Sequence, residues 1–320
     1  MNQTTKKQHY VWRNYLAPWT QNNTTTGQIW CLRDGKAFQT SLINVAQENY
    51  FYEVKELSQD ERNLIIQMVI KNATGVQRDV NEQWLNLYCA PFDYADTMSS
   101  LGYFLLGYNN PDDIKQDQAF RKWTIEQVEI LHGQIESSGL PYISALRQNK
   151  LDFWKDENGR DEFSFYLANQ YFRTKKMRDG LIYAVNKAKE ERKYFHGIRP
   201  ENMWLPLSFI FATNVGAHIA DDYSAILLLT EDINFIVGDQ PVINTHATYD
   251  TKTVPDKLEL FYPITPHSAL LLTDDSKYTS GQVLQIAPDE VEKYNLLERK
   301  STRETVFAKE RTQLDAFISL

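Results

Sequence analysis

The segment NFIVGDQPVINTH, residues 234–246, places two short apolar runs on either side of Gly238-Asp239-Gln240-Pro241. The apolar runs, 235–237 and 242–243, have the composition of buried β-strands. A plain turn explains the polar residues between them, because Asp and Pro are favoured in turns. A functional site explains them equally, since the end of a strand is a frequent place for a catalytic carboxylate. The segment predicts β-structure late in the chain and leaves the role of Asp239 open.

Strand patterns occupy both ends of the chain, and helical patterns fill the middle. Near the N-terminus, GQIWCLRDGKAFQTSLINV alternates apolar and polar residues around Asp34-Gly35, which predicts a β-hairpin. Further on, Ser58 and Glu61 have the spacing of a helix capping box. Pro288 is a favourable first residue for a last helix.

These patterns define four consecutive sub-blocks within one predicted domain, 1–320. The sub-blocks are an N-terminal arm and hairpin (9–56), a helical block (57–222), a strand-rich block (223–286) and a C-terminal helical tail (287–320). We predict an α+β fold in which N- and C-terminal strands form a mixed or antiparallel sheet packed against the central helical block.

Composition and charge limit the classes of function. The net charge of −8 disfavours a general coating of DNA but leaves room for a local basic cleft. Two cysteines, Cys31 and Cys89, are too few for a disulfide framework and favour a reducing compartment. The N-terminal MNQTTKKQHY lacks the apolar centre of a signal peptide, and the apolar run 205–219 is too short for a membrane span. We expect a cytoplasmic protein that does not bind a membrane.

The first candidate site lies in KKQHYVWRNYL, residues 6–16. His9 stands among cations and aromatic residues, which suits a general acid or base with a pKa near neutrality. Tyr10 and Arg13 are its neighbours and candidate ligand-binding residues. The alternative is an ordered N-terminal arm whose aromatic rings anchor it to the protein body.

The second candidate site lies in FYLANQYFRTKKMR, residues 165–178. On a helix, Gln170, Arg173 and Thr174 are spaced i, i+3, i+4 and share one face. An amide, a guanidinium and a hydroxyl on one face suit an anionic or phosphate-bearing ligand. The alternative is a solvated basic helix end, which the helix dipole favours.

A third candidate is the turn Pro263-Ile264-Thr265-Pro266-His267-Ser268, which presents the imidazole of His267 before an apolar strand. Proline-rich turns before strands usually serve as scaffolding. The sequence contains no Gly-rich phosphate loop, GxSxG elbow, HExxH motif or dinucleotide fingerprint. No familiar catalytic motif therefore decides between the alternatives.

Six segments in order resemble the bacterial family called domain of unknown function 4238. They are KKQHYVWRNYL, GQIWCLRD, VAQENYF, ANQYFRT, FIVGDQPV and YPITPHSALLL. The resemblance covers nearly the whole chain. It matches His9, Tyr10 and Arg13 to the family's opening motif, Gln170, Arg173 and Thr174 to its helix motif, and Asp239 and Pro241 to its strand-end motif. Trp12, Lys175, Gly238 and Gln240 depart from the family pattern, and Pro266-His267 keeps the family's turn but adds an imidazole.

The resemblance implies an accessory or defence protein of bacteria and supplies no reaction. Our leading hypothesis is a hydrolase or nuclease acting on nucleic acid or nucleotide, as a toxin or antiphage effector, with Mg²⁺ as a possible cofactor and Asp239 as its candidate ligand. His9, Arg173 and Asp239 are its catalytic candidates, and Tyr10, Arg13, Gln170, Thr174, Gln240 and His267 its ligand-binding candidates.

Two other hypotheses use the same residues. In one, the polar residues form a ligand-sensing module, or bind a protein partner from a defence operon, without catalysis. In the other, they form a buried polar network that ties the N-terminal arm, the helix and the sheet together. The sequence does not specify an oligomeric state.

Overall fold

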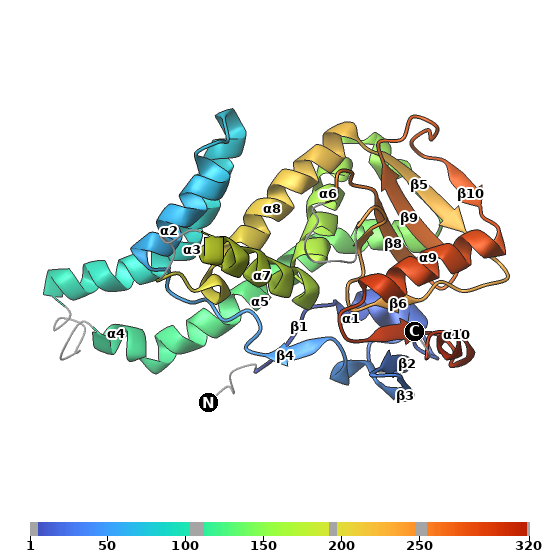
Figure 1. The fold of residues 1–320 in the computed structure, drawn as a ribbon, viewed down its shortest axis with the longest axis horizontal. Helices are drawn as coiled ribbons and strands as arrows, with labels where there is room; N and C mark the ends of the chain where they lie inside the picture. Colours follow the sequence, from blue (N-terminus) through green and yellow to red (C-terminus); the bar gives the residue numbers. More distant parts are fainter. Residues whose placement is uncertain (1–5, 103–111, 192–196, 248–254, 319–320) are drawn as a thin grey trace. The chain divides into compact units, whose positions relative to one another are not determined.

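A computed structural model describes residues 6–102, 112–191, 197–247 and 255–318 (Figure 1). Its α-helices are α1 (Arg13–Leu16), α2 (Gln59–Ile65), α3 (Gly75–Gly102), α4 (Asp112–Gln116), α5 (Gln118–Arg147), α6 (Glu157–Phe172), α7 (Lys175–Glu191), α8 (Pro200–Asp222), α9 (Pro288–Ser301) and α10 (Thr312–Asp315). Its strands are β1 (Lys7–His9), β2 (Gln28–Arg33), β3 (Lys36–Ser41), β4 (Gln47–Asn49), β5 (Ser224–Leu229), β6 (Val237–Gly238), β7 (Ile243–Asn244), β8 (Leu260–Thr265), β9 (Ser268–Thr273), β10 (Val283–Gln285) and β11 (Val306–Ala308). Strands near both ends and helices in the middle confirm the predicted α+β class.

The chain divides into two compact units, each assembled from separate stretches of sequence. Unit 1 comprises Met1–Gln8, Asn49–Gln134 and Leu181–Asn214, and unit 2 comprises His9–Glu48, Ile135–Gly180 and Val215–Leu320. Helices α5, α7 and α8 each begin in one unit and end in the other. The prediction of one domain, 1–320, with four consecutive sub-blocks stays a prediction.

The predicted hairpin forms in unit 2 as β2 and β3. Arg33 and Lys36 pair across the turn, and Asp34 and Gly35 both have positive φ angles, 49° and 69°. These dihedrals suit a tight two-residue turn, which explains why Asp-Gly marks it in the sequence. Strand β11 pairs with β2 and with β6, giving a four-stranded antiparallel sheet of order β3-β2-β11-β6. N- and C-terminal strands therefore share a sheet, as predicted.

Most of the strand-rich block forms a second sheet in unit 2, of order β10-β5-β9-β8-β7. All its pairs are antiparallel except β10 with β5. The two strands of the segment 234–246 belong to different sheets, β6 to the first and β7 to the second. Residues 239–242 therefore connect two sheets and do not close a hairpin.

Alternating residues of β8 face two different partners. Phe261 stacks on Tyr294 of α9 with ring centroids 4.3 Å apart, within an apolar cluster that joins α9 to the five-stranded sheet (Figure 1). Tyr262 stacks on Tyr15 of α1 at 4.7 Å and shares a 3.2 Å hydrogen bond with the hydroxyl of Tyr166. The two-residue period of a strand thus places helices on both faces of this sheet.

Unit 1 is mainly helical, and its first helix, α2, begins at the predicted capping box. The backbone N–H of Glu61 donates to the Ser58 hydroxyl at 3.2 Å, and Glu61 accepts from the Ser58 N–H at 2.8 Å. Helix α8 contains the apolar run 205–219 and is long and apolar enough to cross a membrane, but 67% of that stretch is buried inside the structure. Most of this apolar stretch therefore packs inside the protein, and the cytoplasmic location stays a prediction.

Candidate functional site

The N-terminal arm enters unit 2 at His9. The Nδ1 atom of His9 lies 3.1 Å from the carbonyl oxygen of Val45, and the N–H of Tyr10 donates to the Ala46 carbonyl at 2.9 Å. The Tyr10 side chain is buried, and burial, followed by the negative charge of Asp239, raises the pKa of its hydroxyl. The arm is therefore anchored through its backbone and its ring, and Tyr10 lies within the electrostatic reach of Asp239.

Arg173 is buried with a carboxylate partner. Its Nη1 donates to Glu136 Oε1 at 2.7 Å, its Nη2 donates to the His9 carbonyl at 2.8 Å, and its side chain is 3% exposed. Burial raises the pKa of Glu136, while the positive charges of Arg173 and Arg13 oppose that rise. Arg173 thus holds the N-terminal arm against α5 inside unit 2.

The predicted helix through residues 165–178 ends earlier than expected. Helix α6 ends at Phe172, and α7 begins at Lys175, so Gln170, Arg173 and Thr174 do not share one helix face. Thr174 instead caps α7, because its hydroxyl accepts the Met177 N–H at 3.4 Å. A hydroxyl that accepts from the third residue of a helix stabilises its start, which explains the break at this position.

Thr174 and Gln240 connect the helix junction to the strand end. The Thr174 hydroxyl donates to Gln240 Oε1, and Gln240 Nε2 donates to the carbonyls of Tyr171 at 3.1 Å and Val242 at 2.8 Å. Gln170 is also buried, and its Nε2 has no hydrogen-bond partner among the described residues. The two motifs predicted to form one site do meet, through buried amide and hydroxyl groups.

Asp239 is 1% exposed and accepts backbone N–H groups on both carboxylate oxygens. Its Oδ1 accepts from Arg303 at 2.7 Å, and its Oδ2 accepts from Glu304 at 2.8 Å and Thr305 at 3.1 Å. Burial raises its pKa to about 6, although the three N–H donors act in the opposite direction. These contacts organise the segment that leads into β11.

The surroundings of Asp239 do not resemble a cation site. Both of its oxygens already accept backbone N–H groups, three in all, which occupies most of the lone pairs that a metal ion would use. Within the described ranges, no group of three or more His, Cys, Asp or Glu side chains is close enough to hold a metal. The predicted catalytic roles of His9, Arg173 and Asp239, and the possible metal-binding role of Asp239, stay predictions.

A pocket of about 410 Å³ in unit 2 contains another of the predicted ligand-binding residues, His267. Its lining comes from the start of the chain, the end of α5, the β8–β9 turn and the residue after β11: Ala17, Pro18, Asn23, Arg147, Thr265, Pro266, His267 and Lys309. The lining includes two permanent cations and no carboxylate. We call it the cationic pocket.

Arg147 lies at the end of α5 without an acidic partner. Its Nη1 donates to Asn14 Oδ1 at 3.0 Å and its Nη2 to the Asn14 carbonyl at 2.6 Å, whereas its buried Nε has no partner in the described part of the chain. Burial lowers the pKa of the guanidinium, and nearby tyrosines, Tyr262 first, oppose this. A guanidinium has five N–H donors, so this cation retains unused hydrogen-bonding capacity.

Lys309 supplies a second fixed positive charge to the same pocket. Its Nζ donates to the carbonyls of Thr20 at 2.5 Å and Pro18 at 3.3 Å, and to Asn23 Oδ1 at 2.8 Å. Burial lowers the pKa of this amine, and Glu310 acts against that change. Neither Arg147 nor Lys309 takes part in an ion pair among the described residues. No carboxylate of the described residues therefore lies within ion-pair distance of either cation, although Glu310 acts on Lys309 from further away.

The β8–β9 turn presents His267 rigidly at this pocket. The Thr265 and Ser268 hydroxyls lie 2.8 Å apart and share a hydrogen bond, and the His267 N–H donates to Thr265 Oγ1 at 3.1 Å. The imidazole itself is exposed. His267, a ligand-binding candidate from the sequence, thus lines a pocket, and its binding role stays a prediction. Nothing in the local sequence marked Arg147 or Lys309.

The chain belongs to the family described as protein of unknown function DUF4238, whose model matches residues 7–312. The predicted family resemblance over nearly the whole chain is thereby confirmed. Neither the curated proteins nor the solved structures contain a match to the chain. The family therefore supplies no activity, and the geometry of the site is the basis for any functional conclusion.

Proposed function

We propose that unit 2 binds a small anionic ligand, with a phosphate group seated in the cationic pocket. One observation carries this proposal: Arg147 and Lys309 line the same pocket, and neither is neutralised by a carboxylate. A cation removed from water without an ionic partner costs free energy that an anion can offset. A phosphate oxygen is a strong acceptor for the unused N–H groups of a guanidinium.

The two cations of the pocket belong to an acidic protein. The net charge of −8 repels anions in general, so the pair of cations is a local feature and not one part of a generally basic surface. Lys309 acts mainly through its charge, since its three donors already reach oxygen atoms. Arg147 and the imidazole of His267 supply the directional contacts.

The proposal corresponds to the ligand-binding hypothesis from the sequence and keeps its chemistry, a phosphate-bearing molecule. The hydrolase or nuclease hypothesis uses the same class of ligand and adds turnover. In that case a nucleotide or nucleic acid phosphate would occupy the cationic pocket, and His267 would be the nearest proton-transfer group. A role in toxicity or antiphage defence, and a protein partner in it, are proposals that rest on what the family resemblance implies.

Binding is tested by thermal unfolding in inorganic phosphate, compared with chloride at equal ionic strength. A ligand at 100 times its Kd stabilises the folded state by about 2.7 kcal/mol. We expect phosphate to raise the Tm of the wild type, and Arg147→Gln and Lys309→Gln each to weaken phosphate binding about tenfold. Lys277→Gln is the matched control, because Lys277 is an exposed cation of unit 2 that pairs with Asp275 outside the pocket.

An unchanged phosphate response in both pocket variants would contradict the proposal, as would equal Tm values in phosphate and chloride. Turnover is measured separately by incubating the protein with RNA, DNA and nucleotides, with and without Mg²⁺. Consumption that His267→Ala abolishes would make the protein an enzyme acting at this pocket. Consumption lost in His9→Ala, Arg173→Ala and Asp239→Ala, at unchanged Tm, would instead support the catalytic site predicted from the sequence.

A further inference from the structure

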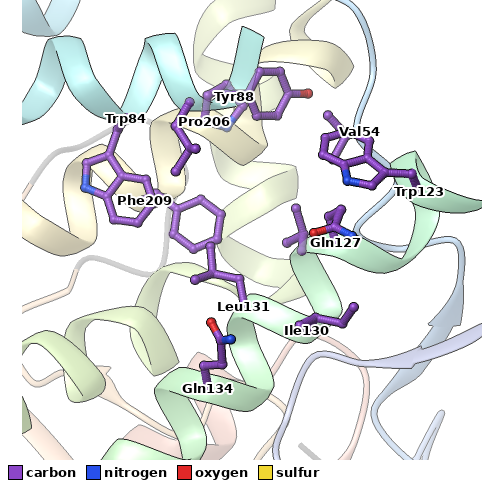
Figure 2. A pocket seen from close by; sticks show the side chains of 12 residues that line it. Val54, Trp84, Tyr88, Trp123, Gln127, Ile130, Leu131, Gln134, Pro206 and Phe209 are labelled. Carbon is purple, nitrogen blue, oxygen red and sulfur yellow. The ribbon is translucent and has the colours of Figure 1, made fainter. Parts of the chain in front are cut away.

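Unit 1 contains a second pocket, of about 240 Å³, whose walls are mainly aromatic and aliphatic (Figure 2). Helix α3 supplies Trp84, Leu87 and Tyr88, and α8 supplies Pro206 and Phe209. The remaining lining comes from α5 and from Val54: Trp123, Gln127, Val128, Ile130, Leu131 and Gln134. Its lining includes no charged side chain, so it differs in kind from the cationic pocket. We call it the aromatic pocket.

The rings contributed by α3 and α8 are held in place by contacts of their own. Trp84 Nε1 donates to Thr213 Oγ1 at 2.8 Å, and the Trp84 ring stacks on Phe209 with centroids 5.0 Å apart. The Tyr88 hydroxyl donates to the Lys55 carbonyl at 2.9 Å. These polar atoms are used to fix the rings, so this part of the wall is rigid and offers mainly apolar surface.

The polar groups contributed by α5 are, in contrast, unused. The Trp123 indole N–H and the amides of Gln127 and Gln134 make no hydrogen bond to the part of the chain that the structure describes. Positions 123, 127 and 134 recur on one face of a helix, and Figure 2 shows the Gln134 amide directed toward Leu131. Three hydrogen-bonding groups along one wall thus face an otherwise apolar pocket.

The rim of the aromatic pocket exposes apolar surface. Leu87 is 62% exposed and Ile130 is 51% exposed, and they come from the two helices that flank the opening. Exposed aliphatic side chains beside a preformed pocket gain free energy when a ligand covers them. The volume lies just below the roughly 300–1,000 Å³ of pockets that enclose drug-sized ligands. The occupant is therefore compact.

We propose that the aromatic pocket binds a neutral, flat heteroaromatic molecule of two or three fused rings, with hydrogen-bonding atoms on its edge. Flat rings match the indole and phenyl walls, and the absence of charged lining residues selects a neutral ligand. The NH₂ group of a glutamine can donate to a ring nitrogen while its carbonyl oxygen accepts from a neighbouring N–H of the same heterocycle, as in glutamine contacts with adenine. A purely hydrocarbon ligand would displace water from the half-buried Gln127 amide without replacing its hydrogen bonds, which is unfavourable, whereas the exposed Gln134 keeps contact with water.

The proposal is tested by calorimetric titration of the full chain with adenine and with lumichrome, which are neutral and carry no phosphate. Indole, which has a ring N–H but no adjacent acceptor, is the comparison ligand. We expect Gln127→Leu to weaken the binding of adenine or lumichrome about tenfold, because one hydrogen bond is lost. The same variant should leave indole binding unchanged. Leu131→Trp should abolish binding of all three by filling the pocket.

Gln118→Leu is the matched control, because Gln118 is a glutamine of α5 outside the pocket. Equal affinity of indole and the heteroaromatic probes, with no effect of Gln127→Leu or Gln134→Leu, would overturn the proposal. So would the absence of binding by both probes, or tighter binding of octanoate than of either. Because the probes lack phosphate and the variants lie in unit 1, these outcomes are independent of phosphate binding at the cationic pocket.

Discussion

Arg173 is a buried arginine of unit 2 and Arg147 is a half-buried one, and their surroundings are opposite. Arg173 meets the carboxylate of Glu136 at 2.7 Å and the carbonyl of His9 at 2.8 Å. Arg147 meets the amide and carbonyl of Asn14, and its Nε has no partner among the described residues. The first environment supplies a carboxylate for the cation, whereas the second supplies none among the described residues. The groups that surround each arginine, more than the sequence motif in which it occurs, therefore indicate its role.

The largest effect that tests this comparison is on stability. Arg173→Met should lower the free energy of unfolding by about 3–5 kcal/mol, because it leaves the Glu136 carboxylate buried without a partner. The double variant Arg173→Met/Glu136→Leu should recover much of the loss, since no uncompensated charge remains. Denaturant unfolding of the wild type, both single variants and the double variant measures both effects. A double variant no more stable than Arg173→Met would mean that the ion pair does not set the cost.

The second test concerns the pH dependence contributed by Asp239. Its carboxyl has a pKa of about 6 in the folded chain against an ordinary value of 3.8, because burial disfavours the charged form. The folded state therefore binds this proton more tightly than the unfolded state does. The contribution of protonated Asp239 to the free energy of unfolding falls as the pH rises from about 4 to about 6. The full difference corresponds to about 3 kcal/mol.

Asp239→Asn removes this titration while keeping the shape of the side chain. The variant loses one of the accepting oxygens and should be less stable than the wild type at every pH. The stability advantage of the wild type should shrink as pH rises through this window. Tm values at closely spaced pH measure it, and an advantage that grows with pH would show that the three N–H donors outweigh burial.

The parts of the fold that local rules govern were predictable. Asp34-Gly35 needs positive φ angles that few other pairs adopt readily, and the Ser58–Glu61 spacing satisfies helix-start N–H groups by itself. The predicted helix through Arg173 and Thr174 was wrong because Thr174 begins a new helix, a choice that its bond to distant Gln240 reinforces.

The cationic pocket was predictable only in part, for a related physical reason. His267 sits in a recognisable turn, so its sequence context marked it. Arg147 reaches Asn14 across 133 positions, and Lys309 reaches Asn23 across 286. Such contacts arise from the tertiary fold, and no local spacing encodes them. Only the three-dimensional positions of the carboxylates show that none of them, among the described residues, pairs with Arg147.

The third test makes in Arg147 the substitution that the first test makes in Arg173. Arg147→Met should lower the free energy of unfolding by about 1 kcal/mol or less, because Asn14 is partly exposed and no carboxylate loses a partner. The same substitution should weaken phosphate binding. Unfolding and phosphate titration of one preparation give both values. A loss of stability as large as that of Arg173→Met would remove the contrast between the two environments.

The smallest expected effect concerns Glu298, the second buried carboxyl beside the strand end. Its Oε2 accepts the Gly238 N–H at 3.1 Å, its Oε1 has no partner among the described residues, and burial raises its pKa well above the ordinary value. Burial thus favours the neutral form of this carboxyl, which Glu298→Gln imitates with a side chain of the same shape. We expect a change below about 1 kcal/mol at pH 7.

Asp239→Asn provides the matched comparison at the same place in the fold, because Asp239 binds three N–H groups and Glu298 binds one. Above the raised pKa of Glu298, the wild type has to ionise a buried carboxyl and the Glu298→Gln variant does not. The variant should therefore gain stability relative to the wild type as the pH rises. Denaturant unfolding at pH 7 and pH 9 measures this change. A strongly destabilised Glu298→Gln at pH 7 would mean that Glu298 is ionised and serves as the partner of Lys176, whose positive charge favours the carboxylate.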